Sequence, residues 1–277
     1  MADKTFKLRF WGTRGTVPTP TAGLLLFGGN TSCVAVDMGA DGHLILDCGS
    51  GVRLLGNELA GDERSVKRFH VFFSHYHFDH IEGLPLFHPL YDQESEFTFY
   101  GLASCGMTVR EILENLVRPP YFPVTFADMP SRRTYVALDG SSQRVGEVAV
   151  CSLPLNHPDG CLSFRLERNG RRIVYATDHE HGDAATDGAL LEFANGADYL
   201  IYDATYMPHE YEKLRRGWGH STWFAAVQTA IKARVKNLVL FHHHPEHTDV
   251  ELTRILEVAR AEFPATHIAR EGLELPL

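Results

Sequence analysis

Short stretches of alternating polar and apolar residues recur along this chain, beginning at residues 7–11. A period of two is typical of a strand that buries one face, and short apolar runs bounded by turn residues are typical of buried strands. Together these patterns predict strands at 7–11, 32–36, 43–46, 68–73, 147–153, 162–167, 172–176, 199–202 and 237–241.

Helix-start signals are interleaved with these strands. The pattern at 108–111 is a capping box, and it opens a helix that the prolines at 119–120 must end. A second capping box at 248–251 opens the last predicted helix, and Ser221 is placed to cap a helical pattern that runs to about Val235. Strands and helices that alternate along the whole chain predict an α/β fold.

No Ser/Pro-rich linker or low-complexity segment divides the chain, so we expect one domain over residues 1–277. Residues 85–135 are rich in aromatic residues and proline, as in RPPYFPVTF, and we interpret them as an insertion or lid beside a site.

Composition and charge narrow the class of protein. Apolar residues make up 44% of the chain, which suits a globular protein with a sizeable core, and no apolar run is long enough to predict a membrane span. The N-terminus has no apolar signal region, and the five cysteines are scattered, so a reducing cytoplasm is the expected compartment. A net charge of −9 argues against non-specific nucleic-acid binding, which relies on basic surfaces.

The segment FFSHYHFDHIEGL, residues 72–84, places His75, His77, Asp79 and His80 directly after a predicted strand. Side chains two positions apart on an extended chain project to the same side. Burying such polar groups unpaired costs on the order of several kcal/mol, and a metal ion removes that cost. Imidazole and carboxylate donors suit Zn²⁺, Mn²⁺ or Fe²⁺ better than Ca²⁺ or Mg²⁺.

One tetrahedral ion cannot hold all four of these side chains and a substrate, so two ions with further ligands are expected. Three other places offer such ligands: His157, Asp178 and the run His242–His244. Each follows a predicted strand, where a rigid scaffold can hold it.

The pattern His-x-His-x-Asp-His after a strand resembles the signature of the metallo-β-lactamase superfamily. FWGTRGTVPTP, GGNTSCVAV and LILDCGSG are similar to that family's first strands, with Asp47 at its usual acidic position. YLIYDATY followed by GHST resembles the branch that contains ribonuclease Z and cyclic-nucleotide phosphodiesterases. The resemblance implies a four-layer αββα sandwich of two mixed sheets with a dinuclear metal site at one edge.

The resemblance also implies how the ligands are shared. It assigns His242, rather than His243 or His244, because His242 comes first after its strand. We expect two divalent ions per chain, with zinc favoured over manganese or iron. One ion would be held by His75, His77 and His157, the other by Asp79, His80 and His242, and Asp178 would bridge them.

Two such ions can hold a hydroxide at neutral pH for attack on phosphorus. His220 of GHST is the candidate general acid, Asp203 would orient it, and Asp79 completes the expected catalytic group. We therefore predict a phosphodiesterase that acts on a small molecule, such as 3′,5′-cyclic AMP. The alternatives are hydrolysis of a carboxyl ester, lactone or thioester at the same site, and an RNA phosphodiesterase activity like that of ribonuclease Z.

Ribonuclease Z usually grips tRNA with a long arm between its third and fourth ligand motifs. Here His157 and Asp178 are too close in sequence for an arm, and Asn169-Gly170 predicts a hairpin turn between them. We therefore expect a small phosphodiester as partner, with no tRNA and no membrane. Relatives often dimerise, which suggests a homodimer by analogy.

Overall fold

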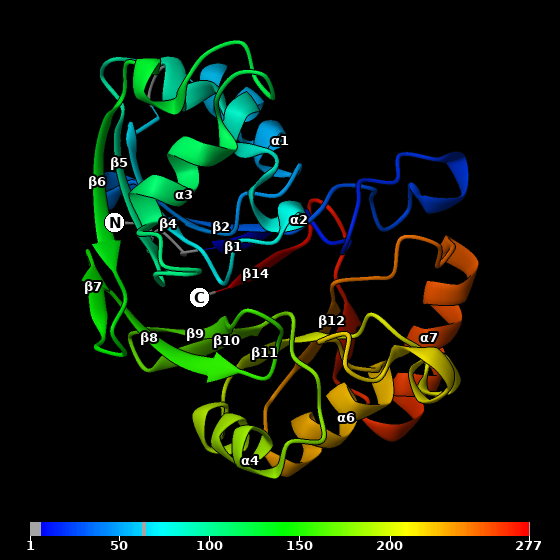
Figure 1. Ribbon diagram of the computed structural model, residues 1–277. Helices are drawn as coiled ribbons and strands as arrows, with labels where there is room; N and C mark the ends of the chain where they lie inside the picture. Colours follow the sequence, from blue (N-terminus) through cyan, green and yellow to red (C-terminus); the bar gives the residue numbers. More distant parts are fainter. Residues whose placement is uncertain (1–6, 63–64, 277) are drawn as a thin grey trace.

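Two mixed β-sheets lie face to face in the computed structural model, which describes residues 7–62 and 65–276. Within these ranges each sheet has seven strands, and helices cover the outer face of each sheet (Figure 1). The predicted four-layer αββα sandwich is therefore confirmed.

The first sheet combines antiparallel strands at one side with parallel strands at the other. β1 pairs antiparallel with β14 and β2, β2 pairs antiparallel with β3, and the remaining neighbours are parallel. In spatial order the strands are β14 (Glu274–Pro276), β1 (Lys7–Gly12), β2 (Cys33–Asp37), β3 (His43–Leu46), β4 (Arg68–Phe72), β5 (Glu96–Gly101) and β6 (Arg132–Ala137).

The second sheet has the same mixture. Its strands from β13 to β10 are parallel, and those from β10 to β7 pair antiparallel. In spatial order they are β13 (Thr266–Ile268), β12 (Leu238–Phe241), β11 (Tyr199–Asp203), β10 (Arg171–Ala176), β9 (Cys161–Arg168), β8 (Val148–Leu155) and β7 (Gln143–Val145).

The helices form the two outer layers. The first sheet is covered by α1 (Val52–Ala60), α2 (Phe78–Ile81) and α3 (Val109–Leu116). The second is covered by α4 (Ala184–Phe193), α6 (Trp223–Lys232) and α7 (Asp249–Glu262), while α5 (Pro208–Glu210) runs into a short π-helical segment, Tyr211–Arg215. Among the helices of the described residues, none combines the length and apolar character needed to cross a bilayer.

A buried apolar core joins the two sheets. Phe72 of β4 stacks on Tyr100 of β5 with ring centroids 4.1 Å apart, and it meets Phe164 of β9 in the facing sheet at 5.5 Å. Both Phe72 and Phe164 are fully buried. This packing holds the ends of β4 and the strands of the second sheet close together, and those ends carry the chemistry described below.

Residues 85–135 differ from the expected insertion or lid. They contain β5 and most of β6, which are parallel strands of the first sheet. The aromatic residues that suggested a lid pack inside this layer: Phe97, Phe99 and Phe126 are all buried. The aromatic content therefore reflects a core, and the connection 102–131 between the two strands covers the sheet's outer face with α3.

The predicted capping boxes and hairpin turn are confirmed, whereas one predicted helix cap is wrong. The capping boxes at 108–111 and 248–251 are present, and Asn169 and Gly170 both have positive φ in the two-residue turn between β9 and β10. The cap of α6 is a correction: Thr222 accepts the hydrogen bond from Ala225 N, and the helix ends at Lys232. Ser221 instead donates its hydroxyl to the carbonyl of His179, so it serves a neighbouring loop.

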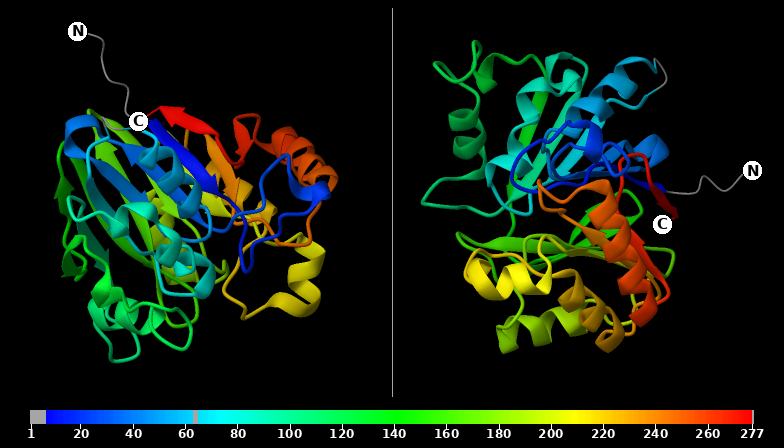
Figure 2. Two further views of the ribbon diagram at one scale, coloured as in Figure 1. Left: turned by 90° about the horizontal axis from the view of Figure 1, so that it is seen from above. Right: turned by 90° about the vertical axis from the view of Figure 1, so that its right-hand side faces the viewer.

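The connection 13–32 between β1 and β2 reaches across to the second half of the molecule. Figure 2 shows it beside the helix α7, and Leu26 N donates to Asp249 Oδ2 at 2.9 Å. Arg14, fully buried in this connection, donates from Nη1 to the carbonyls of His244 (2.9 Å) and His247 (2.7 Å). This connection therefore fixes the loop that follows β12.

Candidate metal centre and catalytic site

The candidate ligands gather where parallel strands end. β4 precedes His75, β10 precedes Asp178 and β12 precedes His242, and ligand sites of α/β sheets commonly lie at such carboxyl ends. Asp178 (φ 51°) and His242 (φ 58°) both have positive φ, as does Asp47 (φ 60°) after β3. This backbone conformation is uncommon for residues other than glycine and clusters at functional sites.

A first group of donors comprises His75, His77, His157 and Asp178, whose donor atoms all lie within 4.8 Å of one another. His157 Nε2 is 3.0 Å from His77 Nδ1, and Asp178 Oδ2 is 3.6 Å from His75 Nε2 and 3.7 Å from His157 Nε2. These residues come from the loops after β4, β8 and β10, so both sheets contribute.

A second group comprises Asp79, His80 and His242. Asp79 Oδ2 lies 3.2 Å from His242 Nε2 and 3.5 Å from His80 Nε2. The other oxygen of Asp178, Oδ1, lies 3.2 Å from His80 Nε2 and 3.3 Å from His242 Nε2. Asp178 thus turns one carboxylate oxygen toward each group, as a bridging ligand would.

In His80 and His157, the ring nitrogen that points away from the cluster makes a hydrogen bond, and the partner shows that this nitrogen carries a proton. His80 Nδ1 lies 2.9 Å from Asp47 Oδ2, and His157 Nδ1 lies 2.7 Å from the carbonyl of Gly219. Since both partners only accept, each Nδ1 donates and each Nε2 is the nitrogen that faces the cluster. Burial would lower the pKa of His80, but the carboxylates of Asp178 and Asp79 raise it, so a metal ion that binds at its Nε2 would replace a proton. Such outer partners orient metal-binding histidines in proteins.

In His75 and His242, the Nδ1 atom is hydrogen-bonded to a neighbouring hydroxyl group. Ser74 Oγ donates to Asp47 and lies 3.1 Å from His75 Nδ1, while Thr205 Oγ1 donates to the His242 carbonyl and lies 3.0 Å from His242 Nδ1. Each hydroxyl has used its hydrogen, so it accepts from the ring. Within the described residues His75 Nε2 is buried and has no hydrogen-bond partner. Converging Nε2 atoms and a buried nitrogen without a hydrogen-bond partner fit a divalent cation.

The electrostatics agree with this donor set. Burial alone would raise the pKa of Asp178, but the imidazoles of His242 and His80 hold it well below its usual range. For Asp79, burial again acts upward, and His80 and His242 lower the pKa well below its usual value. Both carboxylates are therefore ionised, the form in which they bind metals.

The triplet after β12 separates by direction. His242 points into the cluster, whereas His243 Nε2 lies 2.9 Å from the carbonyl of Ala269, and burial lowers the pKa of His243 to about 3. His244 packs its ring against Tyr206 with centroids 5.7 Å apart. The geometry thus favours His242, the member of the triplet that the resemblance indicated.

His220 and Asp203 lie beside the two groups. His220 Nδ1 is 2.8 Å from Asp203 Oδ2, and the His220 ring stacks on His242 with centroids 4.9 Å apart. Burial would lower the pKa of His220, but the charge and hydrogen bond of Asp203 raise it to about 9. These two residues also lie within 4.8 Å of Asp178 and His242, yet their mutual hydrogen bond suits proton transfer rather than metal binding.

A family model described as "Beta-lactamase superfamily domain" matches residues 43–243, which is most of the chain and includes every candidate ligand. The chain belongs to this superfamily. The family resemblance inferred from the motifs is therefore confirmed, and divalent-metal binding is the expectation for this β-lactamase superfamily member.

The proteins that this chain resembles carry several different names. A ribonuclease Z from Picrophilus torridus is 28% identical, over 98% of this chain and 95% of the relative. The fold matches the metallo-β-lactamase fold protein YhfI from Bacillus subtilis with a TM-score of 0.74 at 21% identity, covering 99% of both chains. It also matches a diphosphatase from the PhnP family with a TM-score of 0.69 at 18% identity, covering 98% of both chains.

Glu180 is a residue of this superfamily member that sequence reasoning missed. Its buried carboxylate accepts hydrogen bonds from Tyr211 Oη (2.9 Å), Gly217 N (2.6 Å) and Gly219 N (2.8 Å). Gly219 has φ +84°, and a Cβ there would lie 2.2 Å from His157 Nδ1. Glu180 therefore holds the segment that precedes His220 and accepts from His157. Its partners are more than thirty positions away in sequence, so no local pattern reveals them.

We expect Glu180→Ala to lower kcat about 10- to 100-fold with little change in KM, because small misplacements of catalytic groups have effects of this size. Gln at this position keeps the shape and should restore part of the loss. Hydrogen exchange measured by mass spectrometry should show faster exchange in residues 211–220. Unchanged exchange in this segment would contradict the positioning role, whatever happens to kcat.

Proposed function

We propose that this chain is a metal-dependent phosphodiesterase that hydrolyses a small phosphodiester, with a 3′,5′-cyclic nucleotide as the specific candidate. The observation that carries the proposal is the hydrogen-bonded pair His220–Asp203 beside two ligand groups that share Asp178. The ribonuclease Z and diphosphatase names of its relatives support phosphate-ester chemistry in general.

The donor set supports two divalent ions, with zinc favoured and manganese or iron as alternatives. His75, His77 and His157 would hold one ion, Asp79, His80 and His242 the other, and Asp178 both. When bound, the ions would lower the pKa of a water molecule and offset negative charge on the phosphoryl oxygens. Four buried imidazoles, those of His75, His80, His157 and His242, hold their rings in place around this donor set.

The chain's own residues would then handle the leaving group. Because His220 Nδ1 donates to Asp203, its Nε2 is the nitrogen that can pass a proton to a departing alkoxide oxygen. Asp203 Oδ1 also accepts from Thr205 N at 3.0 Å and from Ser221 N at 3.2 Å, which fixes the carboxylate that orients the ring. A poor leaving group gains most from such an acid.

The size of the substrate is inferred from what the chain lacks around the site. β9 and β10 are joined directly by the two-residue turn at Asn169-Gly170, so no arm extends there. The alignment with the Picrophilus ribonuclease Z runs over 312 positions, more than the 277 residues of this chain, so the relative has inserted segments without counterparts here. Both points favour a small phosphodiester over tRNA.

Two alternative activities follow from specific observations. The curated relatives named ribonuclease Z match over nearly the full chain, which favours RNA as the second candidate substrate. The same ligand groups could also serve a carboxyl ester, lactone or thioester. The paired His220 and Asp203 argue against this last option, because an acyl hydrolase of this superfamily more often relies on a tyrosine or on the metals alone.

A substrate panel tests the proposal. The full chain is loaded separately with Zn²⁺, Mn²⁺ or Fe²⁺ and given 3′,5′-cyclic AMP, bis(4-nitrophenyl) phosphate, a precursor tRNA with a 3′ trailer, a lactone and a thioester. We expect hydrolysis of the first two with the highest kcat/KM. Hydrolysis of the acyl substrates alone, or of the tRNA alone, would overturn the proposal.

A further inference from the structure

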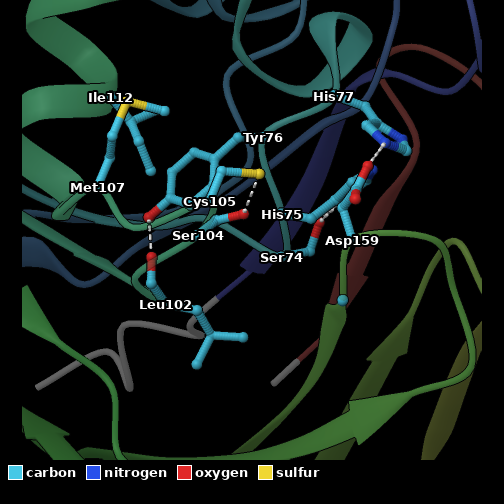
Figure 3. Close-up of a pocket in the computed structure, with 11 residues that line it drawn as sticks. Ser74, His75, Tyr76, His77, Leu102, Ser104, Cys105, Met107, Ile112 and Asp159 are labelled. Carbon is cyan, nitrogen blue, oxygen red and sulfur yellow. Dashed lines mark hydrogen bonds and ion pairs between the residues drawn. The ribbon is translucent and has the colours of Figure 1, made fainter.

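A pocket of about 220 Å³ adjoins the candidate metal centre and is not used by the chemistry described above. Figure 3 shows its two sides: His75 and His77 lie on one, and Leu102, Met107 and Ile112 lie on the other, with Tyr76 between them. The apolar side comes from the connection between β5 and β6 and from α3. A substrate whose phosphate is held at the metal centre therefore has this pocket as its immediate neighbour.

The lining of this pocket is mainly apolar. The Tyr76 hydroxyl already donates to the Leu102 carbonyl at 2.8 Å, which leaves the aromatic ring as the surface offered. Met107 also lines the pocket, and a thioether packs favourably against the edge of an aromatic ring. This combination suits a flat, uncharged ring better than a sugar or a second phosphate.

Charge at the rim points the same way. None of the lining residues in the described part of the chain is a lysine or arginine. Asp159 contributes a largely exposed carboxylate whose Oδ2 lies 3.8 Å from His77 Nε2. A ligand with a second phosphate in this pocket would meet that negative charge with no cation to offset it.

We propose that this pocket binds the nucleobase of the substrate and so selects phosphodiesters that carry one uncharged planar ring. The proposal rests on the phosphodiesterase function and narrows its substrate class. The shared walls His75 and His77, the apolar lining and the acidic side chain of Asp159 support it. Its failure can be told apart from failure of the function itself by the two experiments below.

The first experiment compares two esters with the same leaving group. Thymidine 5′-(4-nitrophenyl phosphate) carries a base, whereas methyl 4-nitrophenyl phosphate does not. We expect the metal-loaded protein to prefer the thymidine ester by at least about 10-fold in kcat/KM, since filling an apolar pocket gives discrimination of this order. Met107→Trp should fill the pocket and reduce that ratio at least about 5-fold. Val258→Trp on α7, which is exposed and lies in the opposite layer, should keep the ratio.

A preference that is absent in the wild-type protein, or that survives Met107→Trp in protein with an unchanged melting temperature, would overturn the pocket assignment while hydrolysis itself still supports the function. If Met107→Trp does not fold, Ile112→Phe is measured in the same way.

The second experiment needs no turnover. Cys105 lines the pocket, is exposed and carries a free thiol, so its alkylation by N-ethylmaleimide can be followed by peptide mass spectrometry. Adenosine 5′-monophosphate should slow alkylation of Cys105 at least about 5-fold, whereas ribose 5-phosphate should not, and neither should change the reaction of Cys151. Equal rates with both compounds would overturn the proposal even if the chain proves to be a phosphodiesterase.

Discussion

Asp178→Asn should strip the protein of most of its bound metal and lower hydrolysis at least about 100-fold. Asp178 faces both ligand groups, with Oδ2 toward His75 and His157 and Oδ1 toward His80 and His242. Loss of an outer partner of a metal ligand already costs about 10- to 100-fold, so loss of a shared ligand should cost no less. Elemental analysis of dialysed protein gives the metal content directly.

The matched control is Asp139→Asn, which changes an exposed carboxylate that accepts a hydrogen bond from the backbone N–H of Ser141. It should retain full metal content and activity. A second readout is the melting temperature, which should rise on addition of zinc in the wild-type protein and in the control, but much less in Asp178→Asn. Two ions still bound to Asp178→Asn after dialysis would refute the bridging assignment.

His220→Ala should leave the metal content unchanged and lower turnover of esters with poor leaving groups by about 10²- to 10⁴-fold, the usual contribution of a general acid. The 4-nitrophenolate ion leaves without needing a proton, so turnover of its esters should fall much less. The measurement is a pair of kcat/KM values, one for 3′,5′-cyclic AMP and one for bis(4-nitrophenyl) phosphate. The difference between the two losses isolates proton transfer from general damage to the site.

His88→Ala, at an exposed position between α2 and β5, serves as the control for removal of an imidazole and should change neither value. Equal losses on both esters in His220→Ala would remove His220 from the acid role. A fall in bound metal in His220→Ala would instead indicate that His220 is a metal ligand, together with Asp178, Asp203 and His242.

That the candidate ligands would lie close together was predictable, because each stands next to a local signal. His75 and His77 follow an apolar strand at a spacing of two, and Asp178 and His242 follow other such strands. Parallel strands bring their carboxyl ends to one edge, so residues far apart in sequence meet there. The turn at 169–170 was predictable for a different reason, since Asn-Gly accepts the positive φ that a tight hairpin needs.

What could not be predicted depends on contacts between distant segments. β5 and β6 could not be predicted because aromatic residues in a proline-rich stretch suit a lid as well as a core. Only the pairing of β5 with β4, and of β6 with β5, decides between the two. The cap of α6 was misassigned because Ser221 and Thr222 are both good caps, and Ser221 is used by the loop at His179. The pocket at Met107 lies between the β5–β6 connection and the loop after β4, so it too depends on segments that are distant in the sequence.

The ligands come from both halves of the sandwich, and this has a consequence for how the protein survives in a cell. His75 to His80 follow a strand of the first sheet, whereas His157, Asp178 and His242 follow strands of the second. Bound ions would therefore link the two halves. Each would add about 2.7 kcal/mol to the free energy of unfolding when free metal exceeds its dissociation constant 100-fold. Under metal starvation the halves would separate more often, and proteases would clear the idle enzyme first.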